Sequence, residues 1–529
     1  MLLIQIISIS KKLKNPMNLK PSEQLSQRQI ARGLDLVIKE GMVTEAMTAL
    51  TGGTFLVALA ILLGASNVQI GILAALPSFS SIFQLAAIFL LQKYNNRRGI
   101  AVISNICARL PLLVIGLLPL IFSKGTSIQV LIFLLFFYYF FGSIAGANWN
   151  SWMKDLVPEQ KLGTYFSKRT RLTQTLNVVL SLAVALSLDY IKRVKPEAEL
   201  KTYAFMFIGG GLIGLISVWL LSKTPEPASF LPKENILRLL KKPLMDKNYR
   251  KLLIFNSFWS FALSIATPFF TVYMLKSLNL PLSYIIAFAI MGQVAGIFAI
   301  KLWGKYSDKF SNKTIIKTAA PLYILCILSW PFAGMAPSLL FVSLIVAMIN
   351  IMSGIATSGI NLSIGNIGLK LASKNEAIVY LTAKNMIVAC FASLGPVVGG
   401  LLADYFSNRS FVWNIQWAGP HGTHILTLLE LHSLGFLFII GGALAFIALK
   451  TLSLINEKGE VPKELAISEM RSGFRNEFKN RLTREALLSL LYSPVLFHNL
   501  VQKKIKNTIE NKLVNMRKWR TTLAEKRTA

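Results

Sequence analysis

Twelve apolar runs divide the sequence, and this pattern limits the fold more than any other feature. A helix needs about 20 apolar residues to cross the hydrocarbon core of a bilayer. The runs fall at residues 41–63, 68–91, 99–122, 127–147, 172–188 and 203–221, and again at residues 252–275, 282–302, 315–335, 338–359, 377–402 and 434–452. Lipid offers the backbone no hydrogen bonds, so each run is expected to form a helix that satisfies its own N–H and C=O groups. The sequence therefore predicts an all-α membrane protein with twelve transmembrane helices.

The composition agrees with a protein embedded in lipid. Hydrophobic residues make up 53% of the 529 residues, and charged residues only 15%. A disordered chain lacks that many apolar residues, and an ordinary soluble enzyme carries charge on about a quarter of its residues. Cys107, Cys326 and Cys390 lie inside apolar runs without a CxxC spacing. That placement is typical of small apolar side chains and not of a disulfide framework.

Positive charge is distributed unevenly along the chain. The formal net charge is +32, and with the N-terminus placed inside, most of the 56 Lys and Arg residues fall in the inner segments. The outer loop that contains Lys192 and Lys201 is the exception. Because cytoplasmic loops are rich in Lys and Arg, we expect a multi-pass protein of the plasma (inner) membrane with both termini in the cytoplasm. This bias accounts for the charge, so no nucleic-acid partner is expected.

A polar linker with several prolines separates the first six runs from the last six. The predicted domains are a cytoplasmic N-terminal segment (1–40), a first six-helix bundle (41–222), the linker (223–251), a second six-helix bundle (252–454) and a basic cytoplasmic tail (455–529). A weak internal repeat supports two pseudo-symmetric bundles, because a shift of 213 positions places Asn148 on Asn361 and Arg171 on Lys384. Transporters built from two parallel repeats have this organisation.

The loop WGKYSDKFSNK, residues 303–313, resembles a motif of the major facilitator superfamily. The match lies in Gly304, Asp308, Lys309 and Lys313. The corresponding first-half segment, FLLQKYNNRRG, keeps its two arginines but lacks the Gly and the Asp. LGPVVGG (394–400) is similar to the family's GPxxGG stretch, but it lies in the eleventh span and not in the fifth, so it does not indicate exchange. The resemblance covers about residues 35–455.

This resemblance implies alternating access between the two bundles and a conformational lock. Asp308 would face the N-terminal end of the fifth span, near Arg169 and Arg171, in one access state. A helix N-terminus and two cations favour such a carboxylate. The alternative is a solvated turn whose charges set topology only.

Ionisable residues within the spans are the strongest functional candidates, because burying charge in hydrocarbon is costly. Arg109, Lys384 and Glu45 lie well inside the runs. Lys384 is the first choice for substrate contact, since the resemblance implies that the eleventh span lines the central cavity. The further candidates are polar: Asn385, Gln84, Gln174, Gln293 and Asn350. An intramembrane ion pair, snorkelling or helix–helix hydrogen bonding would explain the same residues without a substrate.

Two buried cations against one carboxylate indicate an anionic or carboxylate-bearing substrate, although a buried pair would leave the same pattern. Glu45 is the one candidate for a proton-carrying carboxylate.

No GxxxxGK[ST] motif occurs in the sequence, so we expect a monomeric, cofactor-free secondary transporter of a small molecule. Two alternatives stay open. One is a transporter-like scaffold or sensor that moves nothing. The other is a lipid-modifying enzyme, which the lack of HExxH and GxSxG motifs disfavours.

The segments outside the spans give weaker signals. The outer loop 406–433 contains His421, His424, His432 and Glu430, but three histidines in a loop are more typical of an ordinary loop than of a metal site, and no metal is expected. The tail 455–529 mixes Leu and Val with Lys and Arg, which predicts amphipathic helices on the anionic inner leaflet; a solvated charged tail is the alternative. The N-terminus does not resemble a secretory signal, and either Met1 or Met17 is the true start.

Overall fold

The computed structural model describes residues 21–22, 25–158, 161–228, 241–372, 377–419, 422–457, 460 and 469. The predictions for Met1 or Met17 as the start, for His421 and for the tail beyond residue 460, apart from Glu469, therefore lie outside the described residues. Within the described part, twelve helical segments are long and apolar enough to cross a membrane. This confirms the twelve predicted spans. Several helices run past their apolar run, because a helix continues into the polar interface where hydropathy falls: the run 127–147 belongs to a helix over Lys124–Leu156.

The first half holds α2 (Gln27–Thr51), α3 (Gly53–Leu62), α4 (Asn67–Ser81), α5 (Gln84–Tyr94), α6 (Arg97–Ile121), α7 (Lys124–Leu156), α8 (Leu162–Val194), the 3₁₀ turn η2 (Pro196–Ala198) and α9 (Glu199–Ser222). The second half holds α11 (Lys242–Met245), α12 (Lys247–Ala266), α13 (Phe269–Val272), the π-helical η3 (Tyr273–Ser277), α14 (Leu282–Phe310), α15 (Asn312–Ala333), α16 (Leu339–Leu371), α17 (Ala377–Phe406), β1 (Ser410–Gly419), β2 (Gly422–His432), α18 (Gly435–Thr451) and the 3₁₀ turn η4 (Leu452–Leu454).

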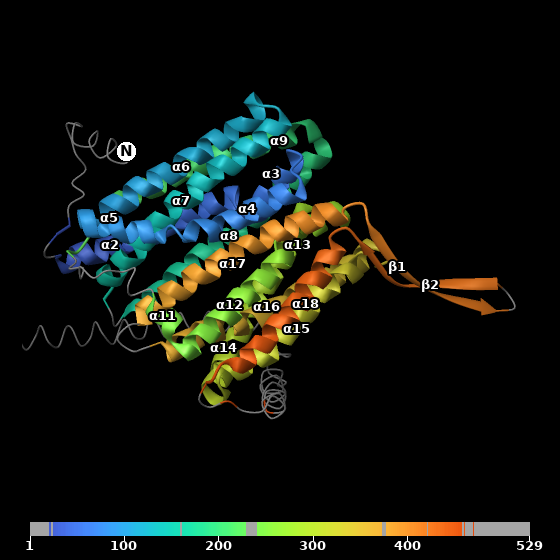
Figure 1. Ribbon diagram of the computed structural model, residues 1–529. Coiled ribbons are helices and arrows are strands. Elements are labelled where there is room, and N and C mark those ends of the chain that lie inside the picture. The colour runs from blue at the N-terminus through green and yellow to red at the C-terminus, as the bar shows by residue number, and fades with distance from the viewer. Residues whose placement is uncertain are drawn as a thin grey trace, which may run out of the picture. The chain divides into compact units, whose positions relative to one another are not determined.

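The two halves repeat each other with a constant offset. α4 begins at Asn67 and α14 at Leu282, which is 215 positions later, and the same offset separates the starts of α6 and α15, of α7 and α16, and of α8 and α17. Neighbour relations repeat as well: α2 packs on α8 and α9 as α12 packs on α17 and α18. Figure 1 shows the first-half helices, blue to green-cyan, beside the second-half helices, green to red-orange. The sequence shift of 213 was therefore off by two positions, because it rested on a short stretch of thin similarity.

The first helix of each half is interrupted at an equivalent point. α2 ends at Thr51, and Gly53 adopts φ +55°, a backbone conformation that residues with a Cβ rarely adopt. In the second half α12 ends at Ala266, and α13 resumes after Pro268. Both interruptions divide a membrane-spanning helix into two segments that can present different faces to the interior.

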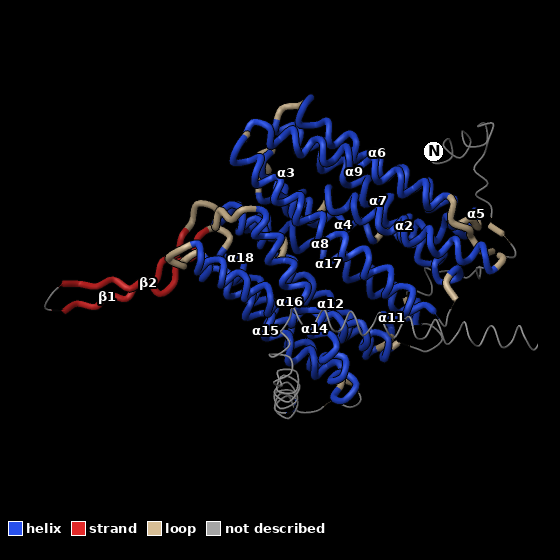
Figure 2. Tube along the Cα trace, turned by 180° about the vertical axis from the view of Figure 1, so that it is seen from behind, coloured by secondary structure: helices blue, strands red, loops and turns tan. Residues whose placement is uncertain are grey.

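The segment 406–433, predicted to be a loop, contains a two-stranded antiparallel hairpin instead. β1 pairs with β2 from Ser410 opposite His432 to Gly419 opposite Gly422. The aromatic and branched residues of FVWNIQW and ILTLLEL favour extended backbone, and the loop prediction gave this propensity too little weight. Figure 2 shows the two strands projecting beyond the ends of the helices.

The helices end at two opposite faces. We call one the basic face; it holds the helix ends near residues 94–97, 156–162, 222, 310–312, 371–377 and 451. We call the other the hairpin face, because β1 and β2 lie there; it holds the helix ends near residues 62–67, 121–124, 194–199, 277–282, 333–339 and 406–435. The two halves are joined chiefly by α4 packed on α17 and by α8 packed on α14. α4 is the hairpin-face segment of the second span, so this packing joins the halves on the hairpin-face side.

Candidate substrate cavity

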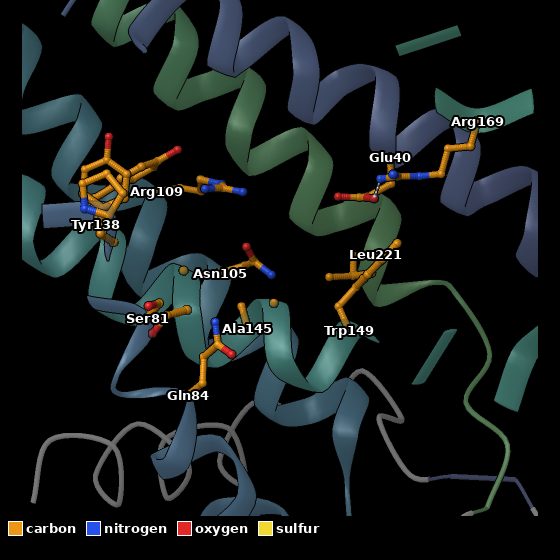
Figure 3. Close-up of a pocket in the computed structure, with 15 residues that line it drawn as sticks. Glu40, Ser81, Gln84, Asn105, Arg109, Tyr138, Ala145, Trp149, Arg169 and Leu221 are labelled. Carbon is orange, nitrogen blue, oxygen red and sulfur yellow. Dashed lines mark ion pairs between the residues drawn. The ribbon is translucent and has the colours of Figure 1, made fainter. Parts of the chain in front are cut away.

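A cavity of about 430 Å³ is walled by first-half residues. Its polar lining includes Glu40, Gln84, Asn105, Arg109, Tyr138 and Arg169. Figure 3 shows Glu40 and Arg169 on one side of the space, with Arg109 and Asn105 opposite them. The cavity therefore presents charges of both signs within the first six-helix bundle.

Glu40 and Arg169 form an ion pair across α2 and α8. The Arg169 Nη2 lies 3.6 Å from the Glu40 carboxylate, which also accepts a 2.7 Å hydrogen bond from Thr44 Oγ1. The guanidinium lies 4.8 Å from the centre of the Trp149 ring. Gly41 leaves room for the guanidinium, since a Cβ at that position would lie 2.6 Å from Arg169 Nη2. Arg169 is thus held in place by the Glu40 carboxylate, the Trp149 ring and close packing on Gly41.

Arg109 has a different environment. Its side chain is buried, with 7% of the residue surface exposed, and its guanidinium lies 5.6 Å from the centre of the Tyr138 ring. Among the residues that the structure describes, no carboxylate lies within ion-pair distance of Arg109, and its buried Nε has no hydrogen-bond partner. Glu40, which lines the same cavity, acts on Arg109 only at longer range. Burying a cation that has no ion-pair partner is costly.

A second cavity, of about 420 Å³, lies between the halves. Glu45 and Asn177 contribute from the first half, where the Asn177 amide donates a 2.7 Å hydrogen bond to the Glu45 carboxylate. Gln293 contributes from α14. Tyr138 and Tyr139 line both cavities, and their rings are 5.0 Å apart in an edge-on arrangement. This tyrosine pair stands where the two cavities meet.

The structure places only part of the predicted substrate set at these cavities. Gln84 and Arg109 line the first cavity, and Glu45 and Gln293 line the second. The remaining predicted residues, Lys384, Asn385, Asn350 and Gln174, line neither. Lys384 is buried, with its Nζ 3.5 Å from the backbone oxygen of Ile364 on α16, and the Asn350 amide donates to Val346 of its own helix at 2.8 Å. Their contact with substrate stays a prediction.

The predicted lock is not formed in this conformation. Asp308 is exposed near the end of α14, and within the described chain its carboxylate has no ion pair or hydrogen bond. Arg171 is exposed as well, while Arg169 is engaged by Glu40. Gly304 and Lys309 lie on α14 on either side of Asp308. A lock between Asp308 and the start of α8 stays a prediction for a different access state.

Two carboxylates cap helix starts at the basic face in a repeated arrangement. Glu226 accepts hydrogen bonds from the backbone N–H groups of Arg97 and Arg98, at 2.8 and 3.0 Å. In the second half Glu457 accepts from the equivalent N–H groups of Asn312 and Lys313, at 3.3 and 2.7 Å. The starts of α6 and α15 are therefore each capped by an acid that follows the last helix of the same half.

Six residues that line these cavities are not among those predicted from the sequence: Glu40, Asn105, Tyr138, Tyr139, Trp149 and Asn177. Glu40 stands one position before the predicted first span, so it was assigned to the cytoplasmic segment. The two tyrosines interrupt the aromatic run FFYYFF. Hydroxyls inside a run of phenylalanines would have been a usable signal, since a buried Tyr hydroxyl needs a polar neighbour.

The Major Facilitator Superfamily profile matches residues 41–377, whereas a search of curated proteins finds no match. Among solved structures, the nucleoside transporter NupG is similar, with a TM-score of 0.58 at 12% identity over 81% of this chain and 99% of that one. An inward-facing bacterial homologue of the human lysosomal transporter Spinster gives 0.56 at 14% identity over 82% and 100% of the two chains. The inward-open xylose transporter XylE from E. coli gives 0.56 at 14% identity over 82% and 98%.

Proposed function

The chain belongs to the Major Facilitator Superfamily, whose members are secondary transporters, and we propose that it carries a small anionic solute whose negative charge binds Arg109. The family and the structural neighbours point to transport and not to catalysis. The observation that carries the anion assignment is the buried Arg109 guanidinium, which faces a cavity and lacks a carboxylate partner among the described residues. A planar guanidinium binds a carboxylate or phosphate through two parallel hydrogen bonds.

Arg169 cannot supply an equal site in this conformation, because Glu40 already neutralises it. The amides of Asn105 and Gln84 lie along the same cavity wall and offer hydrogen bonds to the uncharged part of a solute. The substrate would pass the Tyr138–Tyr139 pair between the first cavity and the second, where Gln293 of the other half becomes available. We further propose that the basic face is the cytoplasmic one, since the Lys and Arg residues gather there.

The repeat supports placing the binding chemistry in the first half. The positions 215 residues after Glu40, Asn105 and Arg109 are Phe255, Ala320 and Ile324. The polar cavity residues of the first half thus have apolar counterparts at the equivalent positions of the second half. A charged solute in this cavity would therefore be held by first-half residues.

Counterflow in proteoliposomes tests the proposal with the purified full chain. The solutes offered are monocarboxylates, dicarboxylates and inorganic phosphate, with neutral sugars, nucleosides and cationic amines beside them. We expect exchange of an anion, and Arg109→Gln is expected to weaken its apparent affinity by about 10- to 100-fold, the contribution of a charge-assisted hydrogen-bond pair. Arg109→Lys should retain part of the affinity.

Arg32→Gln is the matched control, because Arg32 is an exposed cation of α2 that lines neither cavity. It should leave counterflow unchanged. Exchange of neutral or cationic solutes with no anion exchanged would contradict the anion assignment. A folded protein that exchanges none of the solutes would contradict transport itself.

A further inference from the structure

Two aspartates at the hairpin face cross from one half to the other. Asp404, at the end of α17, accepts hydrogen bonds from the backbone N–H groups of Asn67 and Val68 at the start of α4, both at 3.1 Å. Asp189, at the end of α8, accepts from the N–H groups of Leu282 and Ser283 at the start of α14, at 2.9 and 2.8 Å. Each carboxylate therefore closes a helix that belongs to the opposite half.

The two contacts are copies of each other within the repeat. Asp404 lies 215 positions after Asp189, and Leu282 lies 215 positions after Asn67. A helix start carries unpaired N–H groups and the positive end of the helix dipole, both of which favour an anion. The start of α14 has no side-chain cap of its own, because Pro281 precedes it. Asp189 is thus the cap of α14, and it is available only while the halves are together.

Helix approach at the same place is unusually close. A Cβ at Gly71 would lie 2.2 Å from the backbone oxygen of Pro396, and a Cβ at Gly400 would lie 2.6 Å from that of Asn67. The backbones of α4 and α17 therefore touch directly beneath the Asp404 contact. Opening this face would separate the backbones and break all the hydrogen bonds of both aspartates.

We propose that Asp189 and Asp404 are positioning residues for transport, a pair of latches that close the hairpin face in one access state and release it in the other. Both partners of each latch gain water when the face opens, so the contact is reversible: the carboxylate and the N–H groups exchange one set of hydrogen bonds for another. Two latches related by the repeat hold both edges of the interface between the halves, α4 with α17 and α8 with α14. The inference rests on the fold and is independent of the anion assignment.

Sided cysteine labelling tests the latches in the full chain reconstituted in liposomes. Cys107, Cys326 and Cys390 are replaced by Ala, and one reporter is added: Thr54→Cys in the second cavity or Ser143→Cys in the first. A membrane-impermeant maleimide is applied from each side. We expect Asp189→Asn and Asp404→Asn each to raise labelling of the Thr54→Cys reporter from the hairpin side by about 5- to 30-fold, the equilibrium change that one charged cap contributes.

The fold-increases in labelling from the hairpin side should multiply in the double variant, since the two contacts share no residues. Asp→Glu at each position retains the carboxylate and should keep part of the closure of the hairpin face. Glu197→Gln is the control, because Glu197 is an exposed acid at the same face. A structural role alone would lower the melting temperature without changing which side labels. Unchanged sidedness in both Asn variants, or an equal effect of Glu197→Gln, would overturn the proposal. Labelling of the two single variants is measured before that of the double variant, because each single variant leaves the other latch in place.

Discussion

At the scale of single residues, two cations that are equally buried have different surroundings. Arg109 and Lys384 are both exposed by 7%. Arg109 faces a cavity over a tyrosine ring, while Lys384 lies against the carbonyl of Ile364. The repeat makes Lys384 the counterpart of Arg169, 215 positions earlier, but Phe255 occupies the position that Glu40 would require. Lys384 thus carries the same charge as Arg169, but the second half has no acid at the position that corresponds to Glu40.

The Glu40–Arg169 pair should contribute measurably to stability, because both side chains are largely buried, at 10% and 22% exposure. A double-mutant cycle of Glu40→Gln and Arg169→Gln, read by thermal melting of the purified protein, is expected to give a coupling energy of about 1–3 kcal/mol. Glu40→Gln alone should destabilise more than the double variant, since it leaves the Arg169 charge without its partner.

The exposed pair Asp35–Lys39 is the control for this cycle. It lies on the same helix at 2.8 Å, with side chains exposed by 59% and 60%. Its coupling should stay below about 0.5 kcal/mol, as solvent screens it. Equal coupling for the two pairs would show that burial does not strengthen the Glu40–Arg169 contact.

At the scale of elements, the sequence predicted those features that depend on hydropathy along the chain. It located every span, because a run of apolar residues has one stable solution in lipid. It could not tell which side of a helix faces the cavity: Gln84 lines the first cavity and Gln174 lines neither, although both are amides in predicted spans. That difference depends on the rotation of each helix against its neighbours. The pairing of Asp404 with Asn67, more than 300 positions away, needed three-dimensional packing as well.

Packing of α4 on α17 depends on glycine, so a single methyl group should open the hairpin face. Gly71→Ala would place its Cβ 2.2 Å from the Pro396 carbonyl, and backbone cannot rotate aside as a side chain does. We expect a destabilisation of about 1–3 kcal/mol and increased hairpin-side labelling of a cysteine at Thr54. Gly365→Ala on α16, where a Cβ would meet nothing within 4 Å, should neither destabilise the protein nor raise the labelling. If Gly71→Ala labels and melts like the unaltered chain, close packing does not hold this face shut.

At the scale of the whole transporter, charge is arranged differently at its two faces. The hairpin face is closed by acids that reach across to the other half, Asp189 and Asp404. The acids at the basic face, Glu226 and Glu457, instead cap helices of the half that each directly follows in the chain. The basic face can therefore open without breaking these caps. Asp308 is the residue predicted to reach across that face, and it is unengaged within the described chain.

This arrangement predicts effects of opposite sign from removing one acid at each face. Asp404→Asn releases the hairpin face, whereas Asp308→Asn would remove the predicted lock of the opposite access state and favour the conformation described above. We therefore expect Asp308→Asn to lower hairpin-side labelling of a cysteine at Thr54 and to raise basic-side labelling of a cysteine at Ser143, each by about 2- to 30-fold, the range for a carboxylate at a helix start. The double variant Asp308→Asn, Asp404→Asn should return toward the unaltered ratio, because contacts at opposite faces add independently in free energy. A shift in the same direction from both single variants would show that Asp308 stabilises the same state as Asp404, and the predicted lock with Arg169 and Arg171 would then be wrong.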